Sequence, residues 1–418
     1  MNAAWRSVRP DRLTLASFAV LMIAVAGIFA APHVTQLRRD GFEATLAQLY
    51  DGALYSRVVL GVDYFHDGFV RRGLSGTLLA LLPVSPQRQI FWFVAGSLVF
   101  LLVPLALLVR RLIRSSPALG SAYLIATLLL SPQTFLAWSH DLVRTDLLVA
   151  GFMAWAMLFA VRRSWRLAIA TIVTGFLVHE TAFLFGAAVV TAALWLDCRD
   201  GWLPRSRALA LAATLAGSVC LVALLQAAGT VDGAALARRL VEAFPTTRDR
   251  AIERDVAVYM AAGGLSALKT AMCYNFSLDQ GYALKCLFGT GLIAIYLVIL
   301  PTRKYLYACA TAIFAPTLFL MVVANDIGRW LMLAVFCTWL LSAFIVIRQS
   351  GRFAVSSRSI VAGVAAIAAL LTLGYTPYND VNLAAHEFIT THRPDTVYHI
   401  EEWLARCDPA WRLVVYGR

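Results

Sequence analysis

The polar residues with the clearest chemical potential lie in one short segment, Asp63–Gly76, which reads DYFHDGFVRRGLSG. It contains two carboxylates, one imidazole and two adjacent guanidiniums. A carboxylate such as Asp63 or Asp67 can act as a general base that takes a proton from a hydroxyl acceptor. The planar guanidiniums of Arg71 and Arg72 can bind a phosphate or pyrophosphate through paired hydrogen bonds.

The same segment also has a structural interpretation, a turn closed by Asp–Arg salt bridges, because clustered charges serve structure as well as function. Its glycines, Gly68, Gly73 and Gly76, would let the backbone approach a ligand closely. The sequence leaves the structural and the chemical interpretation open.

Three further polar groups interrupt apolar stretches: Ser139–Asp146, His179-Glu180 and Asn325–Trp330. Ionisable side chains at membrane depth cost about 2.5–3.5 kcal/mol on insertion scales, so they usually face a cavity and mark function. The candidate binding residues for substrate or phosphate in these groups are Asp146, His179, Glu180, Asp326 and Arg329. Asp326 and Arg329 are three residues apart, so they could instead form a structural pair on one helical turn.

No metal site is predicted from the sequence. The seven cysteines form neither a CxxC motif nor a cluster with histidine, and no further ligands accompany His179 and Glu180 at a suitable spacing. No cofactor is therefore assigned, and a divalent metal is left open.

The composition is that of a membrane protein. Of the 418 residues, 60% are hydrophobic and only 14% are charged, with a mean hydropathy of +0.72. The net charge of +12 comes from basic residues clustered between apolar runs, as in cytoplasmic loops, so nucleic-acid binding is not expected.

A membrane-spanning helix needs about 20 apolar residues, with a range of about 17–25. The first apolar run, Leu13–Ala31, is interpreted as an uncleaved helix, although its small residues also allow a signal peptide. The eleven predicted spans lie near 13–31, 89–109, 118–138, 146–161, 167–178, 181–196, 208–227, 283–300, 305–323, 329–347 and 359–375.

The charge pattern decides how often residues 167–196 cross the membrane. Five basic clusters, around Arg110, Arg162, Arg205, Arg303 and Arg348, can all be cytoplasmic only if this stretch crosses twice. We therefore expect two short helices that meet near His179-Glu180, lining a protein cavity rather than lipid.

The predicted fold is an all-α polytopic membrane bundle of about eleven transmembrane helices with a cytoplasmic N-terminus. Residues 1–375 form the transmembrane domain, with outer loops 32–88 and 228–282. Residues 233–260 have the pattern of an interfacial amphipathic helix. The non-cytoplasmic segment 376–418 is either a small cap over the site or a poorly ordered tail.

This topology was drawn from arginine and lysine alone, yet it places all four polar groups on the same, non-cytoplasmic face. Their convergence predicts a single functional site on that face.

With an acidic residue in a large first outer loop and about eleven spans, the chain resembles the GT-C glycosyltransferases, which use polyprenyl-phosphate-linked sugars. The resemblance implies that Asp63 or Asp67 is the catalytic base and that Arg71 or Arg72 binds the lipid phosphate. The two aspartates are four residues apart, whereas the family usually has a DD, DE or DxD pair. The choice between them stays open.

The function expected from this resemblance is transfer of a sugar from a polyprenyl-(pyro)phosphate-linked donor to a glycan, lipid or protein acceptor. The expected location is the periplasmic face of a bacterial inner membrane. The alternatives are an O-antigen or exopolysaccharide polymerase, a transporter or flippase, and a non-catalytic assembly protein. The absence of an internal repeat in the sequence disfavours a transporter.

Overall fold

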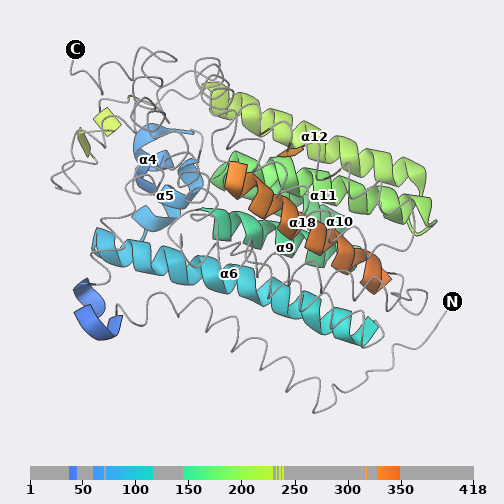
Figure 1. The fold of residues 1–418 in the computed structure, drawn as a ribbon. Helices are drawn as coiled ribbons and strands as arrows, with labels where there is room; N and C mark the ends of the chain where they lie inside the picture. Colours follow the sequence, from blue (N-terminus) through green and yellow to red (C-terminus); the bar gives the residue numbers. More distant parts are fainter. Residues whose placement is uncertain are drawn as a thin grey trace, which may run out of the picture.

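The computed structural model describes residues 37–44, 60–69, 72–115, 145–228 and 327–348, together with isolated positions within 232–239 and 312–320. All regular secondary structure in these residues is helical (Figure 1). The predicted all-α class is therefore confirmed for the described part of the chain, and the total of eleven spans stays a prediction.

Six long helices and two short ones build this part. They are α4 (Tyr64–Asp67), α5 (Gly73–Ala80), α6 (Pro86–Ser115), α9 (Asp146–Val161), α10 (Trp165–Val178), α11 (Glu180–Arg199), α12 (Arg205–Ala228) and α18 (Ile327–Arg348). Three stretches within α6, α11 and α12 are long and apolar enough to cross a membrane: 88–115, 180–199 and 205–226. They coincide with predicted spans, which supports a membrane protein.

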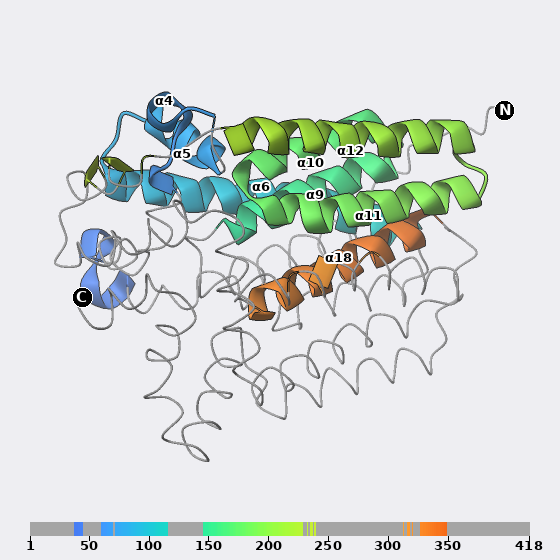
Figure 2. The ribbon, with the colours of Figure 1, turned by 90° about the horizontal axis from the view of Figure 1, so that it is seen from above.

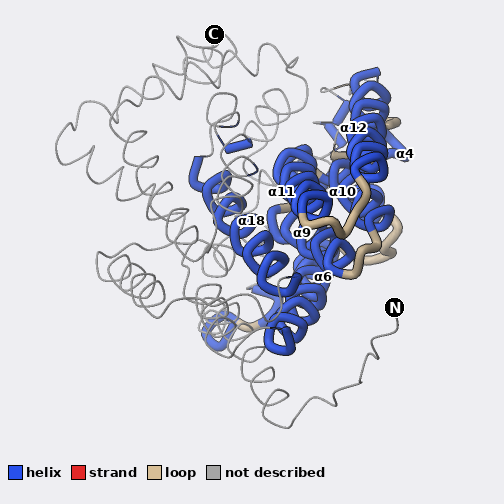
Figure 3. Tube along the Cα trace, turned by 90° about the vertical axis from the view of Figure 1, so that its right-hand side faces the viewer, coloured by secondary structure: helices blue, strands red, loops and turns tan. Residues whose placement is uncertain are grey.

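Helix α9 is the centre of the bundle. It packs against α6, α10, α11 and α18, and the end-on view places it among these neighbours (Figure 3). Twelve of its 16 residues are buried. Helices α12 and α18 lie on opposite flanks of the bundle (Figure 2).

Small residues allow α9 to approach α6, and α10 to approach α11, closely. A Cβ atom added at Gly151 would lie 2.5 Å from the ring of Phe100 on α6, and one at Gly175 would lie 3.0 Å from the Cβ of Ala182. Such close backbone approach favours association of apolar helices because it increases van der Waals contact.

The predicted break near His179-Glu180 is confirmed, but only one of the two helices is short, because α11 has 20 residues and is long enough to cross a membrane. Helix α10 ends at Val178, and His179 has extended backbone angles of φ −162° and ψ 136°. Helix α10 has 14 residues, about 21 Å at 1.5 Å per residue, shorter than a hydrocarbon core of about 30 Å. It packs on α5, α9, α11 and α12, as expected for a short helix shielded by protein.

The arginine clusters gather at one end of the bundle, here called the basic end. The guanidinium of Arg163, in the turn after α9, lies 4.5 Å from the ring centroid of Trp202, in the turn after α11. Arg348, at the end of α18, lies 5.9 Å from the same ring. Arg111 of α6 is close enough to Arg162 to interact with it electrostatically. Members of three predicted cytoplasmic clusters therefore lie at this end, together with the turn that carries the cluster around Arg205.

The opposite end, here called the polar end, holds α4 and α5 (Figure 1). Helices α6, α9, α11 and α18 begin there, and α10 and α12 finish there. The described members of all four polar groups consequently lie at the same end, away from the basic end.

Helix α12 exposes large aliphatic side chains along its length. Leu209, Leu221 and Leu224 are 61%, 58% and 70% exposed. On a helix long enough to cross a membrane, such a surface suits contact with hydrocarbon rather than water.

Several predictions fall outside the described residues. They concern the spans 13–31, 118–138, 283–300 and 359–375, most of 305–323, the basic cluster at 303–304, most of the amphipathic segment 233–260, and the segment 376–418.

The first prediction concerns topology. Because the turn between α11 and α12 belongs to the basic end, a green fluorescent protein fused after Trp202 should fluoresce, as cytoplasmic fusions do. Alkaline phosphatase fused after Ala228, at the polar end, should be active, as only exported fusions are. The measurement is reporter activity in bacterial cells at matched expression. The same compartment for both fusions would contradict a membrane crossing by α12.

The second prediction concerns an ion pair at the basic end. Arg348 donates through Nε to Asp197 Oδ1 at 3.1 Å and also pairs with Oδ2, and the side chains are only 12% and 3% exposed. Asp197→Ala leaves a nearly buried guanidinium unpaired and should cost about 3 kcal/mol. Thermal unfolding in detergent measures the loss.

The double variant Asp197→Ala/Arg348→Leu should recover part of that stability, because it removes both charges. The matched control is the exposed Arg207→Gln at the same end, which should change stability little. Wild-type stability in Asp197→Ala would show that the pair contributes nothing.

Candidate functional site

The site begins with α4, a four-residue helix that exists because Asp63 caps it. Oδ1 of Asp63 accepts hydrogen bonds from the backbone N–H groups of Phe65 and His66, both at 2.9 Å. These amides have no partner within the helix, and a capping aspartate is among the residues that satisfy them best. Gly68, with φ +72°, ends the helix in a conformation that favours glycine.

Helix α5 contacts α4 through Thr77 and the segment before α4 through Gly76. Thr77 Oγ1 accepts from the backbone N–H of Tyr64 at 2.8 Å and donates to the carbonyl oxygen of Gly73 at 2.7 Å. A Cβ at Gly76 would collide with the carbonyl oxygens of Val62 and of Leu60. Glycine is therefore required where α5 meets the segment before Asp63.

Two of the three glycines were expected to let the backbone approach a ligand, but in the structure they lie against other parts of the protein. A Cβ at Gly73 would collide with the ring of Tyr64, and Gly76 faces the protein's own backbone. Both glycines serve the packing of α5 on the segment that carries the aspartates.

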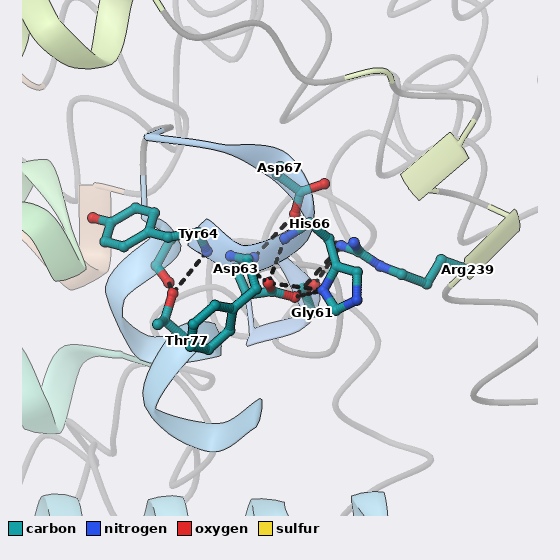
Figure 4. Close-up of polar contacts among 9 residues, drawn as sticks. Gly61, Asp63, Tyr64, His66, Asp67, Thr77 and Arg239 are labelled. Carbon is teal, nitrogen blue, oxygen red and sulfur yellow. Dashed lines mark hydrogen bonds and ion pairs between the residues drawn. The ribbon is translucent and has the colours of Figure 1, made fainter. Parts of the chain in front are cut away.

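Asp63 and His66 form a dyad at the surface (Figure 4). His66 Nδ1 lies 2.9 Å from Oδ1 and 2.8 Å from Oδ2 of Asp63. A carboxylate only accepts hydrogen bonds, so Nδ1 carries the ring proton and donates the hydrogen bond. The Asp63 side chain is 8% exposed, whereas the His66 side chain is 59% exposed. The dyad thus joins a buried carboxylate to an accessible imidazole.

Asp67 is held by a residue far away in the sequence, Arg239. The Nη2 of Arg239 donates to Asp67 Oδ2 at 2.8 Å and to the carbonyl oxygen of Gly61 at 2.9 Å (Figure 4). It also lies 3.9 Å from Asp63 Oδ2. Asp67 Oδ2 further accepts from the backbone N–H of Asp63 at 3.0 Å. One guanidinium therefore serves both carboxylates.

Arg72 and Glu180 join the first polar segment to the helix hairpin. Arg72 Nε donates to Glu180 Oε2 at 2.9 Å, and its Nη2 pairs with Oε1, a two-pronged arrangement. The Arg72 side chain is 9% exposed. Its backbone has φ 65°, a left-handed conformation that costs about 1–3 kcal/mol in a non-glycine residue. The ion pair stabilises the segment in this conformation.

His179 caps α11 rather than presenting a free imidazole at the surface. Its Nδ1 accepts from Thr181 N at 3.2 Å and from the Thr181 hydroxyl at 2.9 Å, and it lies 3.7 Å from Glu180 Oε2. The residue is 1% exposed. Because Nδ1 accepts, the ring proton sits on Nε2.

Asp146 is the first residue of α9 and is 4% exposed. A carboxylate in the first turn is favoured by the positive end of the helix dipole. Its position therefore has a structural explanation beside the predicted binding role.

Tyr64 and Gln226 add a polar pair between α4 and the end of α12. The Tyr64 hydroxyl and the Gln226 amide nitrogen are buried and make no hydrogen bond of ordinary geometry with the described residues. Burial raises the pKa of the Tyr64 phenol, and the nearby Gln226 side chain partly offsets this effect. The phenol therefore stays protonated and available as a donor.

The structure brings some of the residues predicted for the site into direct contact. Asp67 Oδ2 accepts from the backbone N–H of Asp63 beside α4, and Arg72, at the start of α5, pairs with Glu180. Arg71, Asp326 and the side chain of Arg329 lie outside the described part; the backbone of Arg329 belongs to the first turn of α18 at the polar end.

Sequence analysis assigned no role to Arg239 or His66. Arg239 belongs to the second predicted outer loop, 172 residues from Asp67, and no local sequence pattern predicts the contact between them. His66 carried a usable signal, because it lies three residues after an aspartate at a helix start. That spacing places both side chains on one turn.

Among the described residues, no group of three or more His, Cys, Asp or Glu side chains is arranged to hold a metal ion. No protein-family model, curated protein or solved structure matches the chain. The arguments about its function therefore rest on the geometry of the site.

The third prediction concerns the Arg72–Glu180 pair. Glu180→Gln should destabilise the protein by about 1.5–3 kcal/mol, because it removes a charge-assisted pair from a poorly exposed guanidinium. A double-mutant cycle with Arg72→Met, read by thermal unfolding in detergent, measures the coupling. Additive losses in the double variant would contradict a direct interaction.

Arg72→Gly and Arg72→Ala separate the ion pair from the backbone strain. Both lose the pair, but glycine adopts φ 65° without strain, so Arg72→Gly should be the more stable of the two.

Proposed function

We propose that this chain is an integral membrane glycosyltransferase. It transfers a sugar from a polyprenyl-phosphate- or pyrophosphate-linked donor to a hydroxyl group of a glycan, lipid or protein. The chemistry takes place at the polar end, on the periplasmic side of a bacterial inner membrane.

One observation carries the proposal. Two carboxylates, an imidazole and a guanidinium are linked in sequence by hydrogen bonds, from His66 to Asp63, from the Asp63 backbone to Asp67 and from Asp67 to Arg239, at one end of an otherwise apolar bundle. Their contacts connect residues 63–67 with Arg239, and a second ion pair, Arg72–Glu180, ties the adjacent α5 to the hairpin. The network is larger than a single turn needs for its own stability.

A lipid-linked sugar suits such a molecule because the donor has an apolar part, the polyprenyl tail, and a polar part, the phosphate and sugar. Its polyprenyl tail lies in the hydrocarbon of the bilayer, and the exposed leucines of α12 offer an apolar surface that such a tail can contact. Its phosphate and sugar need hydrogen-bonding groups at the membrane boundary. The polar end provides carboxylates to accept protons and guanidiniums to balance phosphate charge.

The proposed step is displacement at the anomeric carbon of the donor. The acceptor hydroxyl loses its proton to a base in the Asp63–Asp67 segment, and its oxygen bonds to the anomeric carbon. The bond from that carbon to the phosphate oxygen breaks, and the electron pair leaves with the phosphate. Arg71 and Arg72 are the predicted phosphate ligands, and Arg239 is a further guanidinium near the carboxylates.

A polysaccharide polymerase would use the same step with a glycan as acceptor, so it is a special case of the proposal. Transport or flipping of a glycolipid is the competing function. It would move a lipid-linked saccharide across the bilayer without breaking its glycosidic phosphate bond.

The fourth prediction tests this function. A strain lacking the gene should accumulate a lipid-linked donor or truncated glycans, and wild-type protein should restore the profile. Asp63→Ala/Asp67→Ala at matched membrane levels should not restore it, because the two carboxylates supply or orient the general base of this segment, and loss of a general base lowers a rate by about 10²–10⁴-fold. The measurement is mass spectrometry of extracted lipid-linked saccharides and surface glycans.

Glu43→Gln is the matched control. Glu43 is a carboxylate on the described surface with a side chain 74% exposed and only a distant contact to Arg88, at 3.9 Å. It should complement fully. Complementation by the double aspartate variant, or flipping of a lipid-linked saccharide by purified protein without turnover, would overturn the proposal.

A further inference from the structure

We propose that His66, oriented by Asp63, is the general base of this site, and that the acceptor hydroxyl approaches its Nε2 from the aqueous side. The inference rests on the proposed function and deepens it, because it assigns the proton-accepting atom and the direction from which the acceptor arrives.

The hydrogen bonds define the state of the imidazole. Nδ1 of His66 points at both carboxylate oxygens of Asp63, at 2.9 and 2.8 Å. A ring that donates through Nδ1 is neutral when Nε2 carries no proton, and Nε2 is then a proton acceptor. Within the described part of the chain, the hydrogen bonds of the His66 ring are those to Asp63. The side chain is 59% exposed, so an acceptor hydroxyl can reach it.

Asp63 is poorly placed to be the base itself. Its Oδ1 already accepts from two backbone amides and from the imidazole, and Oδ2 shares the imidazole and faces Arg239 at 3.9 Å. Its side chain is 8% exposed. To take a proton from a substrate, this carboxylate would have to release the imidazole from Oδ2, or the imidazole and the amides that cap α4 from Oδ1.

Asp67 is held in a similar way through one of its two oxygens. Its Oδ2 accepts from the backbone N–H of Asp63 and is paired with Arg239, and the side chain is 8% exposed. The geometry therefore gives Asp67 a positioning role, which is to hold Arg239 beside the dyad.

Three charged groups lie near His66. Asp63 is in direct contact with the imidazole, Asp67 is the next residue, and Arg239 pairs with Asp67 and lies 3.9 Å from Asp63. In the proposed step the proton of the acceptor hydroxyl passes to Nε2 and later leaves to water. The O–H bond of the acceptor breaks, its oxygen bonds to the anomeric carbon, and the phosphate departs with the electron pair.

The first test measures the accessibility of the His66 imidazole and needs no substrate. Diethyl pyrocarbonate acylates accessible, unprotonated imidazole nitrogens, so the full-length protein in detergent should be modified at His66. The buried His179, 1% exposed, should be protected by the fold. The extent of each modification is measured by peptide mass spectrometry, with denatured protein as the reference. An unmodified His66 in the folded protein would overturn the inference.

The second test separates the two nitrogens of the ring. His66→Asn keeps a side-chain N–H that can donate to Asp63, but it has no counterpart of Nε2. It should lower sugar transfer by about 10²–10⁴-fold while leaving thermal stability close to that of wild type. The matched control is Glu43→Gln, which should transfer sugar at the wild-type rate.

Chemical rescue and a pH profile exclude a merely structural role. In His66→Ala, added imidazole should restore part of the activity in proportion to its unprotonated fraction. Wild-type turnover should fall as the pH is lowered and the imidazole is protonated, and His66→Asn should lack this acidic limb. Asp63→Asn should lower turnover and shift the limb, because it removes the negative charge facing Nδ1.

The outcomes distinguish this inference from the proposed function. Wild-type turnover together with an active His66→Asn would overturn the role of His66 and leave the glycosyltransferase proposal standing. An absence of turnover by wild-type protein supplied with lipid-linked donors would overturn both. An inactive His66→Asn, rescue of His66→Ala and retained stability support the assignment.

Discussion

A charged side chain can stay inside an apolar helical bundle only if an opposite charge satisfies it, and this constraint organises both ends of the molecule. At the polar end Arg72 pairs with Glu180, and at the basic end Arg348 pairs with Asp197. Both carboxylates belong to α11. This helix is consequently fixed at its first turn to the segment that precedes α5, and at its last turn to the end of α18. Its registry against α9 and α10 follows from the two pairs together with the close contacts made by small residues.

The candidate site depends on the packed helices of the bundle, because the site has little secondary structure of its own. Helix α4 has only four residues, and what orders it comes from elsewhere: Thr77 of α5, the backbone fit at Gly76 and the guanidinium of Arg239. The polar network is thus assembled by contacts between segments far apart in the sequence. A packed bundle with a small polar segment at one end suits the proposed reaction, in which an amphiphilic donor and a hydrophilic acceptor approach from different phases.

Hydropathy and arginine clusters were sufficient to predict the described long helices and the break at His179, because both signals are local and repeat along the chain. The grouping of basic turns at one end also followed, since it depends on alternation of helix direction. The ion-pair partners of the charged residues could not be predicted from these signals. Arg72 meets a residue 108 positions away, and Arg239 meets one 172 positions away, and such contacts are set by tertiary packing. The glycines show the same limit: their positions were noted, but their packing against Tyr64 and Val62 required the fold.

The capping role of Asp63 has a consequence for the way the site can be observed. The oxygen atom that binds the imidazole also binds the amide hydrogens of Phe65 and His66. Ordering of the imidazole is therefore coupled to formation of the first helical turn through this one oxygen atom. Hydrogen–deuterium exchange at these two amides reports how often the site is assembled, even when no substrate has been identified.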